Sequence, residues 1–118
     1  MTLSLDANQR LNLVFVLGAY DVRGRELHAV WHLQDSLDLD SAEKDLIEFQ
    51  ETNVNGQQMA RWNPQKTLPA RAFDLSDADL TRVRKAMDEF PQMRASRDRV
   101  WAEPIYAQLP QPVESNGR

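Results

Sequence analysis

The Asn55-Gly56 dipeptide limits what this chain can fold into more than any other short feature of its sequence. Asparagine and glycine both tolerate positive φ angles, which a type I′ turn between two antiparallel strands requires. The preceding residues 47–50 alternate apolar and polar side chains, as is typical of a half-buried strand. Residues 57–62 fit the returning strand, and Pro64 is expected to end it. The sequence therefore predicts a central β-hairpin.

Helical patterns precede this hairpin. Residues 7–17 follow Asp6, which can cap a helix. The apolar residues within 11–17 also alternate, so a buried strand is an open alternative there. Residues 25–37 place their apolar side chains on or near one face, which predicts a second helix. Ser41 can cap one further helical turn.

Two more helices are predicted after the hairpin. Residues 72–73 form a short extended segment, and Ser76 then caps a helix. Its apolar residues are spaced 3, 4 and 3 along one face: Leu80, Val83, Met87 and Phe90. Pro91 ends this helix, because the residue before a proline avoids the helical conformation. Ser96 can cap a last helix, in which Pro104 would introduce a kink or a new turn.

These elements predict a small α+β domain with a central β-hairpin, in the order α-α-short α-β-β-α-α. Residues 1–109 are expected to form one globular domain, and residues 110–118 a flexible tail. The order is at most winged-helix-like. In such proteins the helix before the wing enters the DNA major groove, but residues 40–45 are acidic here and would be repelled by phosphates.

The absence of cysteine from the 118 residues excludes disulfides, thiolate nucleophiles and cysteine metal sites. The first residues lack the basic start and long apolar run of a signal peptide. The longest apolar stretch, residues 13–17, is far too short to cross a bilayer. A cytoplasmic protein without a membrane partner is therefore the expectation.

Two patterns that resemble metal sites are incomplete. His28 and His32 lie four residues apart on a predicted helix and could share a metal ion. Ala29, however, stands where zinc peptidases carry the glutamate that acts as a base. The acids within residues 35–43 lack the central glycine of a calcium loop. No catalytic residue, metal or cofactor is therefore predicted.

Charge is distributed unevenly along the chain. The net charge of −4 argues against a nonspecific binder of polyanions. Residues 33–53 carry one lysine and seven acids: Asp35, Asp38, Asp40, Glu43, Asp45, Glu48 and Glu51. Residues 82–99 carry three acids and six bases: Arg82, Arg84, Lys85, Arg94, Arg97 and Arg99. The two regions are expected either to attract each other weakly across the fold or, for the acids, to steer a cationic partner.

The three tryptophans come from three different predicted elements. Trp31, Trp62 and Trp101 are expected to meet in one core, and Met59 is expected to pack on the hairpin. The alternative is that Trp62 is an exposed anchor for a partner.

The arrangement of apolar segments and turns resembles that of small uncharacterised proteins encoded by bacteriophages and prophages. The resemblance covers most of residues 11–109 and is carried by Leu11–Leu17, Leu27–Leu37, Ile47–Phe49, Asn55-Gly56, Trp62 and Phe73–Ser76 before Leu80 and Val83. It implies an origin, and with it the host cytoplasm as location. It implies no activity and transfers no functional residue.

The predicted function is noncatalytic protein–protein interaction or an accessory role, with a partner that carries a basic surface. The candidate partner-binding residues are Asp38, Asp40, Glu43, Asp45 and Trp62. One alternative is a nucleic-acid-associated regulator that uses residues 82–99. A second is a metal-dependent enzyme at His28 and His32. The sequence leaves the oligomeric state open.

Overall fold

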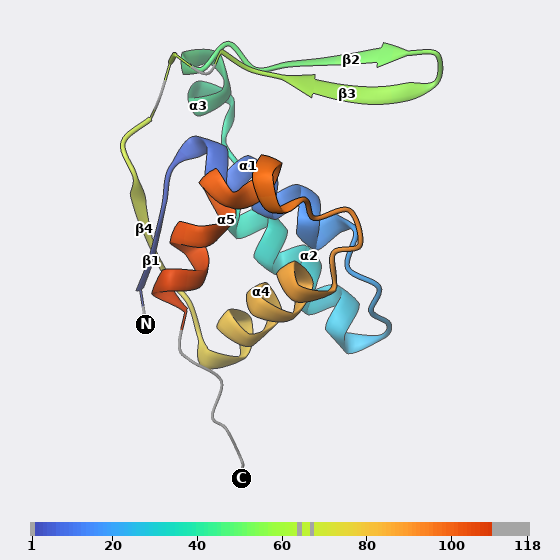
Figure 1. Cartoon of the computed structure of the whole chain (residues 1–118), viewed down its shortest axis with the longest axis vertical. Coiled ribbons are helices and arrows are strands. Elements are labelled where there is room, and N and C mark those ends of the chain that lie inside the picture. The colour runs from blue at the N-terminus through green and yellow to red at the C-terminus, as the bar shows by residue number, and fades with distance from the viewer. Residues whose placement is uncertain (1, 64, 67, 110–118) are drawn as a thin grey trace, which may run out of the picture.

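Five helices and two separate two-stranded sheets make up the residues that this computed structural model describes, 2–63, 65–66 and 68–109 (Figure 1). The helices are α1 (Ala7–Gly18), α2 (Arg25–Leu37), α3 (Ser41–Leu46), α4 (Asp77–Glu89) and α5 (Ala95–Gln108). The strands are β1 (Thr2–Leu5), β2 (Gln50–Val54), β3 (Gln57–Arg61) and β4 (Arg71–Asp74). The predicted α+β class with a β-hairpin is confirmed. Pro64 and the predicted tail lie outside the described residues.

A reciprocal cap begins α1 and decides between its two predicted conformations. The Oδ1 atom of Asp6 accepts a hydrogen bond from the backbone N–H of Gln9 at 2.8 Å. The Oε1 atom of Gln9 accepts one from the N–H of Asp6, also at 2.8 Å. This capping box satisfies N–H groups that have no partner within the helix. Residues 11–17 are therefore helical, and the strand alternative is wrong.

β1 pairs antiparallel with β4, which lies about 70 residues later in the chain. Leu3 and Leu5 point into the core, and Phe73 lies directly opposite Leu3. The side-chain amide of Gln108 bonds to β1 as a neighbouring strand would, accepting from the N–H of Ser4 at 2.7 Å and donating to its carbonyl oxygen at 2.9 Å. The predicted extended segment at residues 72–73 is thus part of β4, whereas β1 was not predicted.

The predicted helix after Ser76 is confirmed as α4. The hydroxyl of Ser76 accepts from the N–H of Asp79 at 3.1 Å. Three residues of the predicted stripe are buried, and the fourth is partly buried at the end of the helix: Leu80, Val83, Met87 and Phe90.

Two other predicted N-caps are wrong, because each serine already lies within its helix. Asp40 precedes α3 and accepts from the backbone N–H of the third helical residue at 2.8 Å, so Ser41 is the first residue of that helix. α5 begins after Arg94, whose N–H donates to Oδ2 of Asp98 at 2.7 Å. Ser96 makes no cap, and the helix continues through Pro104 to its end.

The hairpin forms at the predicted turn but starts later than predicted. Asn55 and Gly56 have φ angles of 55° and 80°, as the predicted turn requires. Ile47 instead ends α3 with a fully buried side chain, and Glu48 has a φ angle of 58°. The predicted strand at residues 47–50 is therefore mostly wrong. Its alternation reflects the packing of a helix end, and β2 begins only at its last residue.

Two hydrophobic clusters hold the described elements together. The larger lies among β1, β4 and the helices α1, α2, α4 and α5. The smaller lies where α3 meets the base of the hairpin and contains Ala7, Leu39 and Ile47, with Leu11, Phe49, Trp62 and Leu68 packed against them. No described helix is long and apolar enough to cross a membrane.

The three tryptophans occupy three environments, so the prediction that they share one core is wrong. Trp101 is buried in the larger cluster and Trp62 is half-buried beside the smaller one. Trp31 lies on α2 with 49% of its surface exposed, edge-on to His28. Met59 is equally exposed on β3, so the prediction that it packs is also wrong.

Arg10 is buried at the junction of these elements, with 1% of its surface exposed. Its guanidinium forms a bidentate pair with Glu43, at 2.6 and 3.1 Å. It also donates to the carbonyl oxygens of Leu37 and Asp38, at 2.9 and 2.8 Å. The same group lies 5.1 Å from the centre of the Phe73 ring. One side chain of α1 therefore fixes the end of α2, the start of α3 and strand β4.

Replacing Gly56 with valine should loosen the hairpin without unfolding the helices. Apart from the two adjacent residues, no atom of the described residues lies within 4 Å of the position that a Cβ would take, so the cost is backbone strain of about 1–2 kcal/mol at positive φ. Because an isolated two-stranded hairpin is marginal in water, its amides should exchange faster with solvent while those of α1 and α4 stay protected. Asn55→Gly, which tolerates the same turn, is the control. Unchanged exchange in Gly56→Val would contradict the strain.

Replacing Arg10 with methionine should destabilise the whole fold by about 3 kcal/mol or more, since a buried acceptor set is left unpaired. Glu43→Gln should cost less, because that side chain is partly exposed. The guanidinium lowers the pKa of Glu43, so this pair stabilises the fold above pH 4.5 and stops doing so as the pH falls. Thermal melting should show the gap between wild type and Glu43→Gln narrowing in acid.

The control for Arg10 is Arg99→Met, which breaks the exposed pair between Arg99 and Glu103. Exposed pairs contribute about 0–1 kcal/mol, so its melting temperature should hardly change. An equal fall in melting temperature in Arg10→Met and Arg99→Met would show that the burial of Arg10 adds nothing to the stability of the fold.

Candidate functional site

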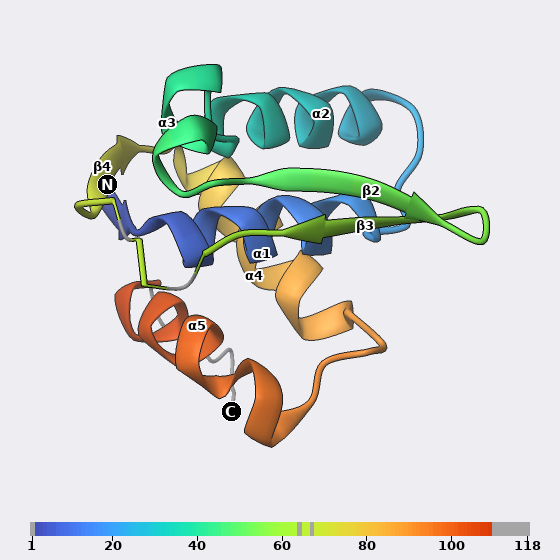
Figure 2. The same ribbon diagram turned by 90° about the horizontal axis from the view of Figure 1, so that it is seen from above.

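α1 lies between the hairpin and α5 (Figure 2). Side chains of α1 line a groove there together with residues of the hairpin base and of α5. It consists of two hollows of about 390 and 430 Å³ that share Asn12, Phe15 and Trp62. We call the two together the α1 groove. The first hollow is also lined by Asn8, Val16, Phe90, Gln92, Arg97, Asp98, Val100 and Trp101. The second is also lined by Leu11, Val14, Asp38, Lys44, Phe49, Glu51 and Ala60.

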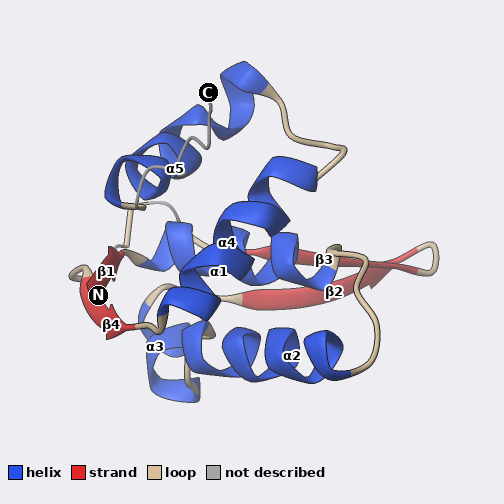
Figure 3. Ribbon diagram, turned by 90° about the horizontal axis from the view of Figure 1, so that it is seen from below, coloured by secondary structure: helices blue, strands red, loops and turns tan. Residues whose placement is uncertain are grey.

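The hairpin supplies one wall of the groove. It runs along α1, and its turn projects beyond the helices (Figure 3). Side chains alternate across a strand, so Glu51 and its partner Ala60 share the face toward α1. Thr52 and Met59 share the opposite face. This wall is therefore a single two-stranded layer, and the face that carries Thr52 and Met59 is exposed.

Aromatic rings line both halves of the groove. Trp62 stacks on Phe49 at the base of the hairpin, with centroids 6.4 Å apart and planes inclined by 19°. Phe15 meets Phe90 edge to face at 5.9 Å. Phe15 is 65% exposed although α1 buries its neighbours Val16 and Leu17. The groove thus contains rings from α1, from the base of the hairpin and from the residue that follows α4.

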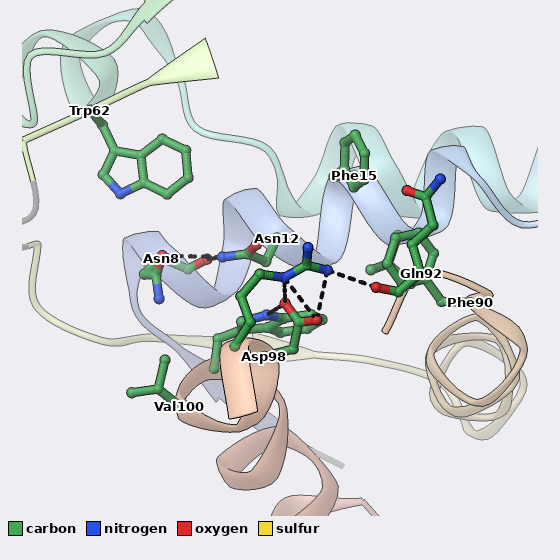
Figure 4. Close-up of a pocket in the computed structure, with 11 residues that line it drawn as sticks. Asn8, Asn12, Phe15, Trp62, Phe90, Gln92, Asp98 and Val100 are labelled. Atoms are coloured by element: carbon green, nitrogen blue, oxygen red, sulfur yellow. Dashed lines mark hydrogen bonds and ion pairs between the residues drawn. The ribbon is translucent and has the colours of Figure 1, made fainter. Parts of the chain in front are cut away.

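Neutral amides lie between these rings (Figure 4). The Nδ2 atom of Asn12 donates to the carbonyl oxygen and Oδ1 of Asn8, at 2.8 and 3.1 Å. Within the described part of the chain, Nδ2 of Asn8, Oδ1 of Asn12 and the side-chain amide of Gln92 bond to no other residue. These groups can therefore offer donors and acceptors to a bound molecule.

The deepest charged group of the groove, Asp98, is held as an anion. Its carboxylate accepts from Arg97 at 2.9 Å, from the N–H of Arg94 at 2.7 Å and from the indole N–H of Trp101 at 3.0 Å. The hydrogen bond from Arg97, followed by those two donors, lowers the pKa of Asp98 to about 2 despite its burial. With its proton-accepting positions engaged, Asp98 is poorly placed to act as a general base.

At the hairpin end, Lys44 lies 4.0 Å from the carboxylate of Asp38 and 5.3 Å from the centre of the Phe49 ring. This ammonium and the guanidinium of Arg97 are thus both engaged by acids of the same chain. Four of the five charged residues that line the groove therefore form two ion pairs, and Glu51 is the fifth.

The predicted partner-binding residues have different positions and partners in the structure. Asp38 and Trp62 line the α1 groove. Asp40 caps α3, and Glu43 is bound to Arg10, so both are committed to the fold. Asp45 is exposed and lies outside both hollows.

Phe15 and the groove amides were not among the predicted site residues. Phe15 was predicted only as one of the apolar residues within 11–17. Its position off the buried face of α1, beside Asn8 and Asn12, is the signal that marks it, and that face is defined only once the segment is known to be helical.

Three bases of the basic region, Arg82, Arg97 and Arg99, pair with acids outside residues 33–53. Arg82 pairs with Glu26 at 2.8 Å and with Asp79 at 2.6 Å. Arg97 pairs with the adjacent Asp98. Arg82 thus bridges to α2, Arg97 pairs with its neighbour, and neither base is engaged by the acidic residues 33–53 as predicted.

His28 and His32 are both exposed on α2. Among the described residues, no group of three or more histidine, cysteine, aspartate or glutamate side chains could hold a metal ion. The expectation that this protein works without a metal stays a prediction.

Searches against protein-family models, curated proteins and solved structures found no match to this chain. The resemblance to small phage proteins therefore stays a prediction, and the function must be argued from the groove itself.

The low pKa of Asp98 predicts a specific acid sensitivity. Because the folded pKa of about 2 lies below the ordinary value of 3.8, this carboxylate stabilises the fold above pH 4 and loses that effect as the pH falls toward 2. Melting temperatures of wild type and Asp98→Asn should differ most near neutral pH and converge in acid. Asp45→Asn, an exposed control, should follow wild type throughout. A difference in melting temperature between wild type and Asp98→Asn that does not change with pH would contradict a stabilising effect of the ionised Asp98 carboxylate.

Proposed function

We propose that this protein is a noncatalytic binding module that holds an apolar segment of a protein partner in the α1 groove. The observation that carries the proposal is the exposure of Phe15 within a groove that already contains Trp62, Phe49 and Phe90. Aromatic side chains dominate the energetics of protein interfaces, and an exposed ring in a concave site is a common anchor point. The lack of cysteine is compatible with a partner met in the cytoplasm.

The lining of the groove supports binding rather than catalysis. Asn8, Asn12 and Gln92 are neutral and do not titrate. Asp98 is fixed by three donors, and neither histidine lines the groove. No serine, threonine, cysteine or histidine is among the lining residues of either hollow, so the nucleophile–base pairs built from these residue types are absent there.

The acidic segment contributes less to this proposal than its charge suggests. Asp40 and Glu43 serve α3 and Arg10, and Asp38 lies beside Lys44. Asp35 and Asp45 remain exposed and can steer a cationic partner toward the protein. Such steering would change the association rate more than the affinity.

Site-specific photocrosslinking tests the proposal. A benzoylphenylalanine in place of Phe15 should capture a partner in a lysate of the encoding organism, while the same residue at position 46 should not. Leu46 is a matched control, because its 61% exposure is close to that of Phe15 and it lies outside both hollows. The captured protein, once purified, should bind Phe15→Ser about tenfold more weakly, a loss of about 1.4 kcal/mol.

Leu46→Ser should bind that partner like wild type. The variant with Asp35→Asn and Asp45→Asn should bind with a slower on-rate at low salt and little change in affinity. Equal capture from positions 15 and 46, or unchanged binding by Phe15→Ser, would show that the groove is not the interface.

A further inference from the structure

We propose that the segment held in the α1 groove is a proline-rich stretch in the polyproline II conformation. This inference rests on the proposed function and adds the class of ligand to it. It follows from three properties of the groove: neutral amides with free donor and acceptor atoms, aromatic rings, and two ion pairs within the chain that engage four of its five charged lining residues.

The amides favour a ligand whose backbone needs partners. A helical ligand satisfies its own carbonyl groups and would cover Asn8, Asn12 and Gln92 with apolar side chains. Those amides would lose water and gain nothing in return. A polyproline II segment has no internal hydrogen bonds, so all of its carbonyl oxygens can accept from groups such as the Nδ2 atom of Asn8.

The rings favour proline among extended ligands. Pyrrolidine rings pack against aromatic faces, and proline-rich segments dock in aromatic-lined grooves elsewhere by this principle. Asn8 and Phe15 are seven residues apart on α1, a rise of about 10 Å. One turn of polyproline II advances about 9 Å, so an amide contact and a ring contact can recur on the same side of such a ligand.

The charges favour an uncharged ligand. Arg97 is engaged by Asp98 at one end of the groove, and Lys44 lies beside Asp38 at the other. A charged side chain of a ligand would find no free opposite charge in these two ion pairs, and it would lose its hydration on entering the groove. Proline with aliphatic residues meets this condition.

The test uses three synthetic peptides, each acetylated and amidated, with the intact protein. The first has three Pro-Pro-Leu repeats, the second carries alanine for every proline, and the third is an amphipathic helix of leucine, alanine and glutamine. Titration is followed by the side-chain amide signals of Asn8, Asn12 and Gln92 and by the indole signal of Trp62 in nitrogen-edited NMR spectra. The proline peptide should bind saturably and about tenfold tighter than either other peptide.

Substitution then locates the contact. Asn8→Ala should bind the proline peptide about threefold to tenfold more weakly, as expected for one lost hydrogen bond, and Phe15→Ser should bind it at least as weakly. Asn8→Ala should melt no lower than wild type, because alanine is the better helix former. Leu46→Ser should bind the peptide like wild type.

Preference for the helical peptide, or no preference among the three, would overturn the proline assignment. So would unchanged affinity in Phe15→Ser. If the groove signals instead shift with protein concentration alone, the occupant is a second copy and the assignment is wrong. Capture from position 15 without peptide binding would leave the proposed function standing and remove only the proline class, whereas failure of both would remove both.

Discussion

The buried guanidinium of Arg10 is the interaction on which the remaining structure depends. A charge so deep in a protein is stable only when its donors are satisfied, and this one has a carboxylate, two backbone carbonyls and an aromatic ring around it. The partners come from α2, α3, β4 and the turn between the two helices. Elements distant in sequence are thereby held at defined positions, which nonpolar contacts alone, being nondirectional, would specify less closely.

The contacts of Arg10 also determine where the hairpin lies, and with it the shape of the α1 groove. Arg10 positions α3 through its bond to Glu43. The hairpin follows directly after α3, and the N–H of Phe49 donates to the carbonyl oxygen of Lys44 at 2.9 Å. The N–H of Asn63 donates to the carbonyl of Ile47 at the same distance, which closes the base of the hairpin. The strands themselves are exposed on both faces. The hairpin wall of the groove is therefore held by these hydrogen bonds at its base.

The sequence predicted the features that depend on neighbouring residues, and it did not predict those that depend on contacts between distant segments. The Asn55-Gly56 turn and the stripe of α4 follow from backbone conformation and helical periodicity, so both were predictable. β1 was not, because four residues pair with a strand about 70 positions away. Phe15 and Trp62 illustrate the same limit at the site: an apolar residue type indicates burial, but exposure is decided by which neighbours the fold supplies. Arg10 carried no sign of burial, since its partners lie on other elements.

The pairing of β1 with β4 has a consequence for the order of events during synthesis. A ribosome adds about 5–20 residues per second, so β4 follows β1 by roughly 3 to 15 seconds. Gln108, which bonds to the other edge of β1, follows later still. Throughout that interval, Leu3 and Leu5 belong to a nascent strand whose sheet partner does not yet exist. The first strand made is thus among the last to be completed, and during that time its apolar face is available to chaperones and to other nascent chains.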